Sequence, residues 1–182
     1  MCPVCVKGKA REDAHYRKVR KEEGDKPIVG LDYKSFGQSL EEDDKNTAIL
    51  LRDRDSIVTQ AHVVGCKGAS DEWIVEKLVE GINDMGYTDI ILKGDGEPSL
   101  VQVMKAIQAK RDHATIVVNP PAYDPQSNGC IEKAVDQFMG HLRTLKLGLE
   151  SRVGEVIDTQ WAVMNWLVEY ACATINRGQV GH

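Results

Sequence analysis

The sequence has few cysteines and no long apolar run. Its 182 residues include five cysteines, at positions 2, 5, 66, 130 and 172. An odd number of cysteines at irregular spacing argues against the disulfide framework of small secreted domains. No stretch approaches the ~18 apolar residues of a membrane helix, and the residues after Met1 lack the apolar segment of a secretory signal. We therefore expect an intracellular protein with no membrane partner, or a piece of a larger polyprotein.

Basic residues are scarce outside the start of the chain. The formal net charge is −5, yet residues 1–26 hold eight Lys/Arg against five Asp/Glu, so residues 27–182 carry the whole acidic excess. A nucleic-acid-binding domain typically has a basic patch and a high pI, so this balance argues against such a partner. Cations held by some of the carboxylates would neutralise part of the charge. Hydrophobic residues make up 42% of the sequence, which supports one domain with a short appendage.

Periodicity predicts an α/β domain that begins with strands. The first three strands can pair as an antiparallel meander, whereas the fourth and fifth follow helical crossovers and so add in parallel. With the fourth strand beside the first, this order is that of the ribonuclease-H-like fold, a five-stranded mixed sheet flanked by helices. The predicted strands are 27–34, 47–52, 56–65, 90–92 and 114–118, with a turn at 52–55, and the predicted helices are 70–86, 98 onward, 131–149 and 159–176.

Three acidic residues stand where predicted elements begin or end. Asp32 follows the apolar run 27–31, Asp95 lies between two glycines after the apolar run 90–92, and Glu132 lies at the start of a predicted helix. An acid embedded in an apolar strand needs a partner or an ion, because burying an unpaired charge is costly. If the three converge, they form a divalent-metal site, because Mg²⁺ prefers carboxylate oxygen. The alternative is three ordinary solvated acids.

The ends of the chain differ from the domain between them. Cys2 and Cys5 have the ligand spacing of half a zinc site, and His15 alone does not complete it. This pair is therefore either a partial Zn²⁺ site or a chance spacing. The basic residues that follow can contact phosphates or form a solvated linker. We predict an appendage at 1–26, a domain at 27–176 and a truncated tail at 177–182.

A loop leads into the helix that carries Glu132. Residues 119–129 include three prolines and end in Ser127-Asn128-Gly129, which predicts a restricted loop with a flexible end. Such a loop either gates access of a substrate or only connects two elements. Three basic side chains lie off the apolar stripe of the following helix and can meet nucleic acid: Lys133, Arg143 and Lys146.

The acidic motifs resemble those of the retroviral-type integrase catalytic core, and most closely those of LTR-retrotransposon polyproteins in the DDE superfamily. The matching motifs are Leu31-Asp32-Tyr33, Gly94-Asp95-Gly96-Glu97 and Gln126-Ser127-Asn128-Gly129-Cys130-Ile131-Glu132-Lys133, within a resemblance that covers 27–176. The 36 residues between Asp95 and Glu132 are close to the family's usual spacing. Cys2-Pro3-Val4-Cys5 resembles the end of the family's zinc module, whose two histidines are absent. Gly96 stands where the family often has Asn.

The resemblance implies DNA integration by a metal-dependent polynucleotidyl transferase. Two Mg²⁺ or Mn²⁺ ions, roughly 3.5–4 Å apart, would be held by Asp32, Asp95 and Glu132, with Asp32 bridging both. Water would be the nucleophile for 3′-end processing, and a DNA 3′-hydroxyl would be the nucleophile for strand transfer. The implied partners are element ends, target DNA and further copies of the chain in a homo-oligomer. Gln126, Ser127 and Asn128 would contact the DNA, in the nucleus if the host is eukaryotic.

Other functions fit the same sequence features. A DDE transposase or a ribonuclease-H-like nuclease would use the same scaffold and the same acids. A catalytically idle nucleic-acid-binding remnant would account for the incomplete flanks and the acidic charge. A fold kept for dimerisation alone is a further alternative.

Overall fold

The structure is a computed structural model that describes residues 26–37, 46–118 and 129–178. No helix within these ranges is long and apolar enough to cross a membrane. The described strands are β1 (Ile28–Phe36), β2 (Asn46–Asp53), β3 (Thr59–Val64), β4 (Ile90–Lys93) and β5 (Thr115–Val118), and the described helices are α2 (Glu72–Asp84), α3 (Pro98–Lys110), α4 (Gly129–Val153) and α5 (Val163–Gly178).

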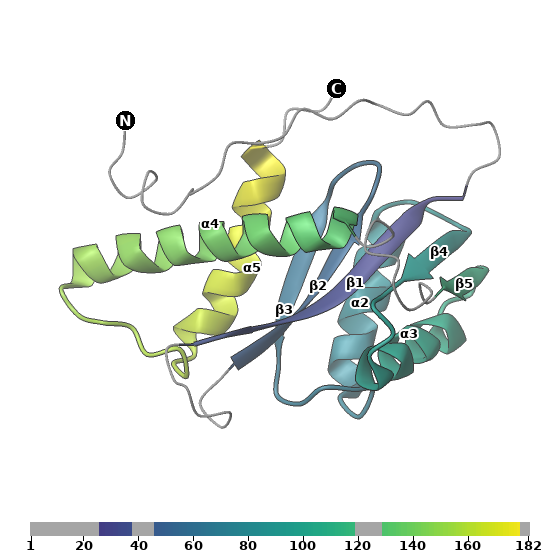
Figure 1. Cartoon of the computed structure of the whole chain (residues 1–182), viewed down its shortest axis with the longest axis horizontal. Coiled ribbons are helices and arrows are strands. Elements are labelled where there is room, and N and C mark those ends of the chain that lie inside the picture. Colours follow the sequence, from purple (N-terminus) through teal and green to yellow (C-terminus); the bar gives the residue numbers. More distant parts are fainter. Residues whose placement is uncertain (1–25, 38–45, 119–128, 179–182) are drawn as a thin grey trace.

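The five strands form one mixed sheet in the order β3-β2-β1-β4-β5 (Figure 1). β1 pairs antiparallel with β2, and β2 pairs antiparallel with β3. β4 lies parallel to β1, and β5 lies parallel to β4. The chain reaches β4 and β5 through α2 and α3, because a parallel neighbour requires a crossover. The predicted meander, and the predicted place of the fourth strand beside the first, are both confirmed.

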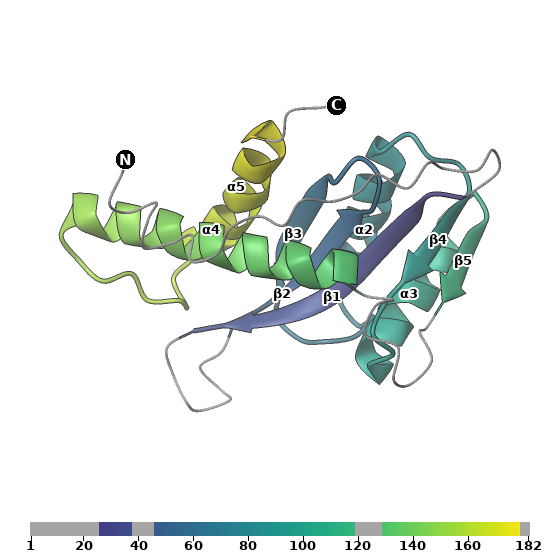
Figure 2. The same ribbon diagram turned by 45° about the horizontal axis from the view of Figure 1, so that its top comes forward.

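Helices cover both faces of the sheet, so the domain has two hydrophobic cores (Figure 2). α2 and α3 pack on one face, and α4 and α5 pack on the other. Successive side chains of a strand point to opposite faces. Leu31 and Tyr33 of β1 are buried on the α2/α3 side. Asp32, which lies between them, therefore points to the side that α4 covers.

The predicted strand 47–52 extends to Asp53, so the predicted turn at 52–55 starts too early. Arg52 and Asp53 belong to β2 and are buried, with Asp53 fully so. Asp53 accepts hydrogen bonds from the backbone N of Ser56, at 2.8 Å, and from the Tyr87 hydroxyl, at 2.9 Å. Asp53 stays inside because the fold supplies polar partners for its carboxylate. The turn begins after them, and β3 begins at Thr59.

The outer edge of β3 is capped by a side chain from α5. Asn176 Oδ1 accepts from the backbone N of Thr59 at 2.9 Å, and Asn176 Nδ2 donates to the Thr59 carbonyl at 2.8 Å. The amide thus replaces a neighbouring strand at that point. Satisfying an exposed strand edge limits unwanted pairing with another chain.

Candidate functional site

Strand register sets Asp32 and Asp95 at matching positions. Gly30 of β1 pairs with Lys93 of β4, and each aspartate follows its paired residue by two positions. Asp32 is half-buried within β1, whereas Asp95 is exposed just past the end of β4. Parallel strands run in the same direction, so Asp32 in the middle of β1 lies level with Asp95 just past the end of β4. The predicted neighbourhood of Asp32 and Asp95 is thus built into the sheet.

The first turn of α4 brings Glu132 to the same place. Ile131 is buried against β1, where a Cβ atom added to Gly30 would lie 3.1 Å from the Ile131 Cβ. In both views the start of α4 lies over β1 (Figures 1 and 2). Glu132 is the next residue, and it is exposed. A carboxylate from a third element therefore arrives beside Asp32.

The three acids interact through their charges. The pKa of Asp32 is raised from 3.8 to about 6, chiefly by burial and next by the negative charge of Asp95, with a smaller contribution from Glu132. A hydrogen bond from the Tyr33 backbone and the charge of Lys34 oppose this rise only in part. Clustered like charges with a strongly perturbed pKa are typical of functional sites. A bound cation would remove the repulsion.

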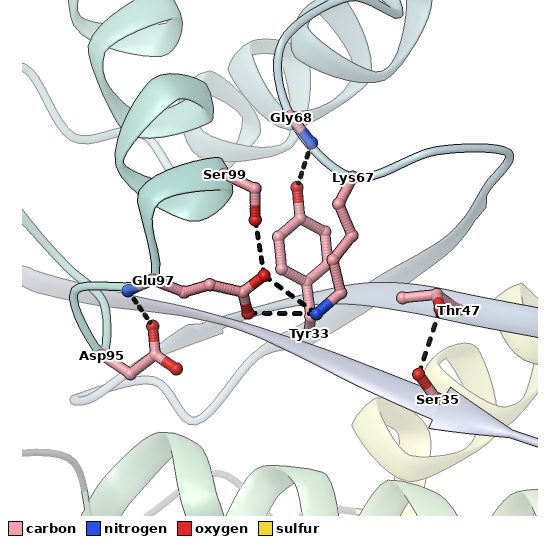
Figure 3. Close-up of polar contacts among 8 residues, drawn as sticks. All are labelled: Tyr33, Ser35, Thr47, Lys67, Gly68, Asp95, Glu97 and Ser99. Carbon is pink, nitrogen blue, oxygen red and sulfur yellow. Dashed lines mark hydrogen bonds and ion pairs between the residues drawn. The ribbon is translucent and has the colours of Figure 1, made fainter. Parts of the chain in front are cut away.

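Neighbouring groups hold the loop that carries Asp95 (Figure 3). The backbone N of Glu97 donates to Asp95 Oδ1 at 2.9 Å. The Glu97 carboxylate in turn accepts from Ser99 Oγ at 2.6 Å and from Lys67 Nζ at 2.9 Å. Ser99 and, after it, Lys67 hold the pKa of Glu97 below its ordinary value. Figure 3 shows the second oxygen of Asp95 pointing away from Glu97.

Glu97 is a positioning residue that the sequence did not mark as part of the site. Its carboxylate ties the Asp95 loop to Lys67, which lies 30 positions earlier in the chain. The Gly94-Asp95-Gly96-Glu97 motif contains Glu97, but the motif gives no sign of a partner so distant. Gly96 adopts a φ of +86°, a value that suits glycine and strains other residues.

The donor set fits a divalent cation in chemistry, but its three acids do not form a closed ligand shell. Three carboxylates supply the hard oxygen ligands that Mg²⁺ and Mn²⁺ prefer, and the raised pKa of Asp32 marks an excess of negative charge there. Yet the described part of the chain holds no group of three His, Cys, Asp or Glu side chains placed to bind one ion. The charges of Asp95 and Glu132 thus act on Asp32 without the three acids forming such a group.

The basic residues predicted to contact DNA differ from one another in their surroundings. Lys133, beside Glu132, and Arg143 are exposed on α4. Lys146 is only 13% exposed and forms an ion pair with Glu150 at 2.5 Å. Glu150 also accepts from the backbone N of Ile157 at 2.8 Å, which ties the segment after α4 back to the helix. Lys146 thus has an ion-pair partner within α4, and its contact with DNA stays a prediction.

Arg143 and Lys146 line a hollow of about 430 Å³ between β1, α4 and the start of α5. Arg143 lies eleven positions after Glu132, which is about 16 Å along a helix axis. The hollow is therefore separate from the acids. The remaining predicted contacts lie outside the described residues, so Cys2, Cys5, Gln126, Ser127 and Asn128 stay predictions.

No protein-family model matches this sequence, and a search of curated proteins finds no match. Solved structures do match. The catalytic core domain of BIV integrase is 15% identical over 85% of this chain and 86% of that one, with a TM-score of 0.57. The HTLV-2 integrase catalytic core domain in complex with magnesium, in its dimeric form, is 13% identical over 87% of this chain and 93% of that one, with a TM-score of 0.58.

A longer structure matches as well. A chain in the simian T-cell lymphotropic virus intasome, solved in complex with PP2A regulatory subunit B56 gamma, is 18% identical over all of this chain, with a TM-score of 0.62. This chain spans 59% of that longer chain. At such low identity the likeness establishes the fold. The chain has the ribonuclease-H-like fold of retroviral integrase catalytic cores, so the predicted α/β fold class is confirmed.

Proposed function

We propose that this chain is an integrase-type catalytic core that cuts and joins DNA. The observation that carries the proposal is the electrostatic cluster of Asp32, Asp95 and Glu132, which come from three elements of an integrase-like fold. A related fold is known with a cation, because the HTLV-2 core was solved in complex with magnesium. DNA, as element ends and target, is the proposed substrate, and the host nucleus is the proposed location in a eukaryote.

The proposed reaction is phosphoryl transfer in two steps. In 3′-end processing, the oxygen of water bonds to phosphorus, and the bond from phosphorus to the 3′ oxygen breaks. That oxygen takes a proton and leaves as a 3′-hydroxyl. In strand transfer, this hydroxyl attacks a phosphodiester of the target strand and displaces the target's own 3′ oxygen. When bound by Asp32, Asp95 and Glu132, two divalent cations would activate the attacking oxygen and stabilise the leaving one.

Residues of the chain hold the three acids in place. Asp32 is fixed within β1, and Glu97 holds the loop of Asp95. Glu132 belongs to the first turn of a helix that is packed on β1 through Ile131. Both Asp95 and Glu132 are exposed, so a nucleic-acid strand can reach the acids without unfolding the core.

The direct test is a strand-transfer assay with oligonucleotides that carry the ends of the element encoding this chain. With Mg²⁺ or Mn²⁺, we expect joined products from the wild type. Asp95→Asn and Glu132→Gln should each reduce joining by at least ~100-fold, more than the usual effect of losing a group that only supports a metal ligand. Glu155→Gln, which changes an exposed acid beyond α4, is the matched control and should retain activity. Cleavage without joining would favour a ribonuclease-H-like nuclease.

A second candidate is a catalytically idle nucleic-acid-binding module. The observation that favours it is the lack, in the ranges that the structure describes, of three acids gathered closely enough to hold an ion. Metal titration separates the two functions, because a ligand that binds only the folded state raises stability. If Mg²⁺ and Mn²⁺ leave the melting temperature of EDTA-treated protein unchanged, the idle module is the better account.

The proposed homo-oligomer has a candidate surface around β3. There, Trp166 and Tyr170 of α5 stack with ring centroids 4.7 Å apart, and both are exposed. On the adjoining side, His62 of β3 contacts Glu169 at 3.0 Å and the edge of the Trp73 ring. We call these five residues the β3 patch. Exposed aromatic clusters are typical of protein–protein contacts.

A further inference from the structure

A small cationic cavity lies beneath the first turn of α4. Its volume is about 50 Å³, and its charged lining consists of Arg52, Arg54 and Lys93. Gly30 contributes backbone only, and Cys130 and Ile131 of α4 close the other side. No carboxylate is among the residues that line it. Three positive charges around so small a space favour an anionic ligand.

Arg52 is the buried member of this cavity and has an unused donor. It is 8% exposed. Its Nη1 donates to Thr59 Oγ1 at 2.5 Å, and its guanidinium is in hydrogen-bonding contact with the Cys130 thiol. Its Nε is buried and has no hydrogen-bond partner. A buried charged donor without an acceptor is costly, so an acceptor supplied by a ligand would complete the site.

Two acids, Asp53 at the end of β2 and Asp55 just after it, lie near the cavity residues in the sequence. Asp53 points to the opposite face of the sheet, where it accepts from Ser56 and Tyr87. Asp55 lies 3.8 Å from Arg54 Nε in a largely exposed pair, and exposed pairs of this kind are weak. The backbone N of Arg54 donates to the Ile28 carbonyl at 2.9 Å, which fixes this residue at the rim of the cavity. Neither acid is among the residues that line the cavity.

The cavity lies next to the acidic cluster along the same strands. Gly30 and Lys93 each precede an acid of the cluster by two residues, a distance of about 6.6 Å along a strand. On α4, Cys130 and Ile131 immediately precede Glu132. A nucleic-acid strand with one phosphate at the acids would thus bring a neighbouring phosphate close to the cavity.

We propose that the cavity of Arg52, Arg54 and Lys93 binds one phosphate group, and that in the working protein this is a backbone phosphate of the DNA next to the one that reacts. Guanidinium groups suit this ligand because their planar donors match phosphate oxygens. The space admits a single oxyanion and excludes a base. The identity of the ligand as DNA rests on the proposed function, whereas the binding of phosphate does not.

The first experiment uses inorganic phosphate and the full chain. Thermal unfolding is followed as phosphate replaces chloride at constant ionic strength. We expect phosphate to raise the melting temperature of the wild type. Arg54→Gln and Lys93→Gln should each weaken phosphate binding at least ~10-fold, as expected for loss of one charge-assisted hydrogen bond. Lys105→Gln removes an exposed charge on α3, across the sheet, and should respond like the wild type. An equal response from all four proteins would overturn the proposal.

The second experiment tests the source of the phosphate. Binding of an oligonucleotide is measured over a range of salt concentrations, because each phosphate contact contributes about one unit to the slope of log affinity against log salt. Arg54→Gln and Lys93→Gln should each lower that slope by about one, and Lys105→Gln should not. Loss of phosphate binding with an unchanged slope would overturn DNA as the source and identify free phosphate as the ligand.

The outcome can be separated from the test of the catalytic function. Asp95→Asn should lose strand transfer while its response to inorganic phosphate is preserved. If the wild type joins no DNA but Arg54→Gln still loses phosphate binding, the proposed function fails and the phosphate site stands. If the wild type joins DNA but phosphate changes the melting temperature of every variant equally, the proposed function stands and the phosphate site fails.

Discussion

Gly30 of β1 and Ile131 of α4 lie so close together that a side chain at position 30 would press on Ile131. A Cβ atom there would lie 3.1 Å from the Ile131 Cβ, tighter than nine in ten such contacts. This approach seats the first turn of α4 on the strand that carries Asp32. Glu132 follows Ile131 directly. The spacing between Asp32 and Glu132 therefore depends on Gly30 having no side chain.

Gly30→Val is therefore expected to disturb the site more than the fold. The branched side chain would push α4 away from β1, at a cost of about 1–3 kcal/mol in the free energy of unfolding, as is usual for overpacking. It should also lower metal-dependent DNA joining, because Glu132 moves with the helix. Urea unfolding and the strand-transfer assay measure the two effects.

Gly148→Ala is the matched control in the same helix. Nothing lies within 4 Å of a Cβ at that position, and replacing a glycine inside a helix with alanine stabilises it by about 0.5–1 kcal/mol. Its activity should be unchanged. If Gly30→Val were as stable and active as the wild type, the close packing of α4 on β1 would not govern the site.

Asp32→Asn is expected to stabilise the metal-free protein at neutral pH while abolishing activity. The pKa of Asp32 is about 6 in the folded state, against an ordinary value of 3.8. As pH rises from about 4 to 6, the folded state holds a proton that the unfolded state has lost, so the wild type loses stability across this window. Asparagine cannot ionise and avoids the loss. Allowing for partial exposure, the gain above pH 6 should be about 1–2 kcal/mol.

The measurement is urea unfolding in EDTA at pH 4 and pH 8. The gain should be present at pH 8 and absent at pH 4, and Mg²⁺ should stabilise the wild type but not the variant. Asp112→Asn, an exposed acid between α3 and β5, should show neither effect. A loss of stability in Asp32→Asn at pH 8 would mean that the ionised carboxylate has a favourable partner within the fold.

The elements that build the site follow local rules, which is why the sequence could predict them. Asp32 and Asp95 each follow an apolar run, and a parallel fourth strand has to be reached through a helical crossover. With the fourth strand beside the first, these two facts bring the acids close together on adjacent strands. The start of α4 was equally predictable, because Ile131 opens a stripe at helical spacing.

Long-range partners explain what the sequence could not predict. Arg52 and Asp53 look like turn residues, yet Asp53 is buried because it binds the Tyr87 hydroxyl, 34 positions away. The role of Glu97 depends on Lys67, 30 positions earlier. Lys146 is a different case. Its partner Glu150 lies four residues on, a spacing that favours helix ion pairs, so the sequence did contain that signal.

Substitutions of Arg143 and Lys146 are expected to have different effects, the first on DNA binding and the second on stability. Arg143→Gln removes an exposed charge, so it should weaken oligonucleotide binding and lower the salt slope by about one, with stability unchanged. Lys146→Gln breaks the pair with Glu150 and should cost about 1–2 kcal/mol in the free energy of unfolding, with the salt slope unchanged.

The double variant Lys146→Gln/Glu150→Gln shows how much of that cost comes from the unpaired carboxylate. Equal salt slopes for Arg143→Gln and wild type would remove Arg143 from the DNA surface.

The β3 patch is expected to mediate self-association through its stacked rings. Trp166 is 56% exposed and Tyr170 36% exposed, and large aromatic residues often dominate the free energy of an interface. The variant Trp166→Ser/Tyr170→Ser should therefore raise the dissociation constant of the oligomer by at least ~10-fold, the usual loss on removing one such anchor. Sedimentation velocity over a range of concentrations measures this constant.

Val156→Ser removes an apolar side chain that is 71% exposed in the segment between α4 and α5, so it controls for a general loss of surface hydrophobicity. A wild type that stays monomeric throughout, or a double variant that associates as tightly, would contradict the role of the β3 patch in self-association.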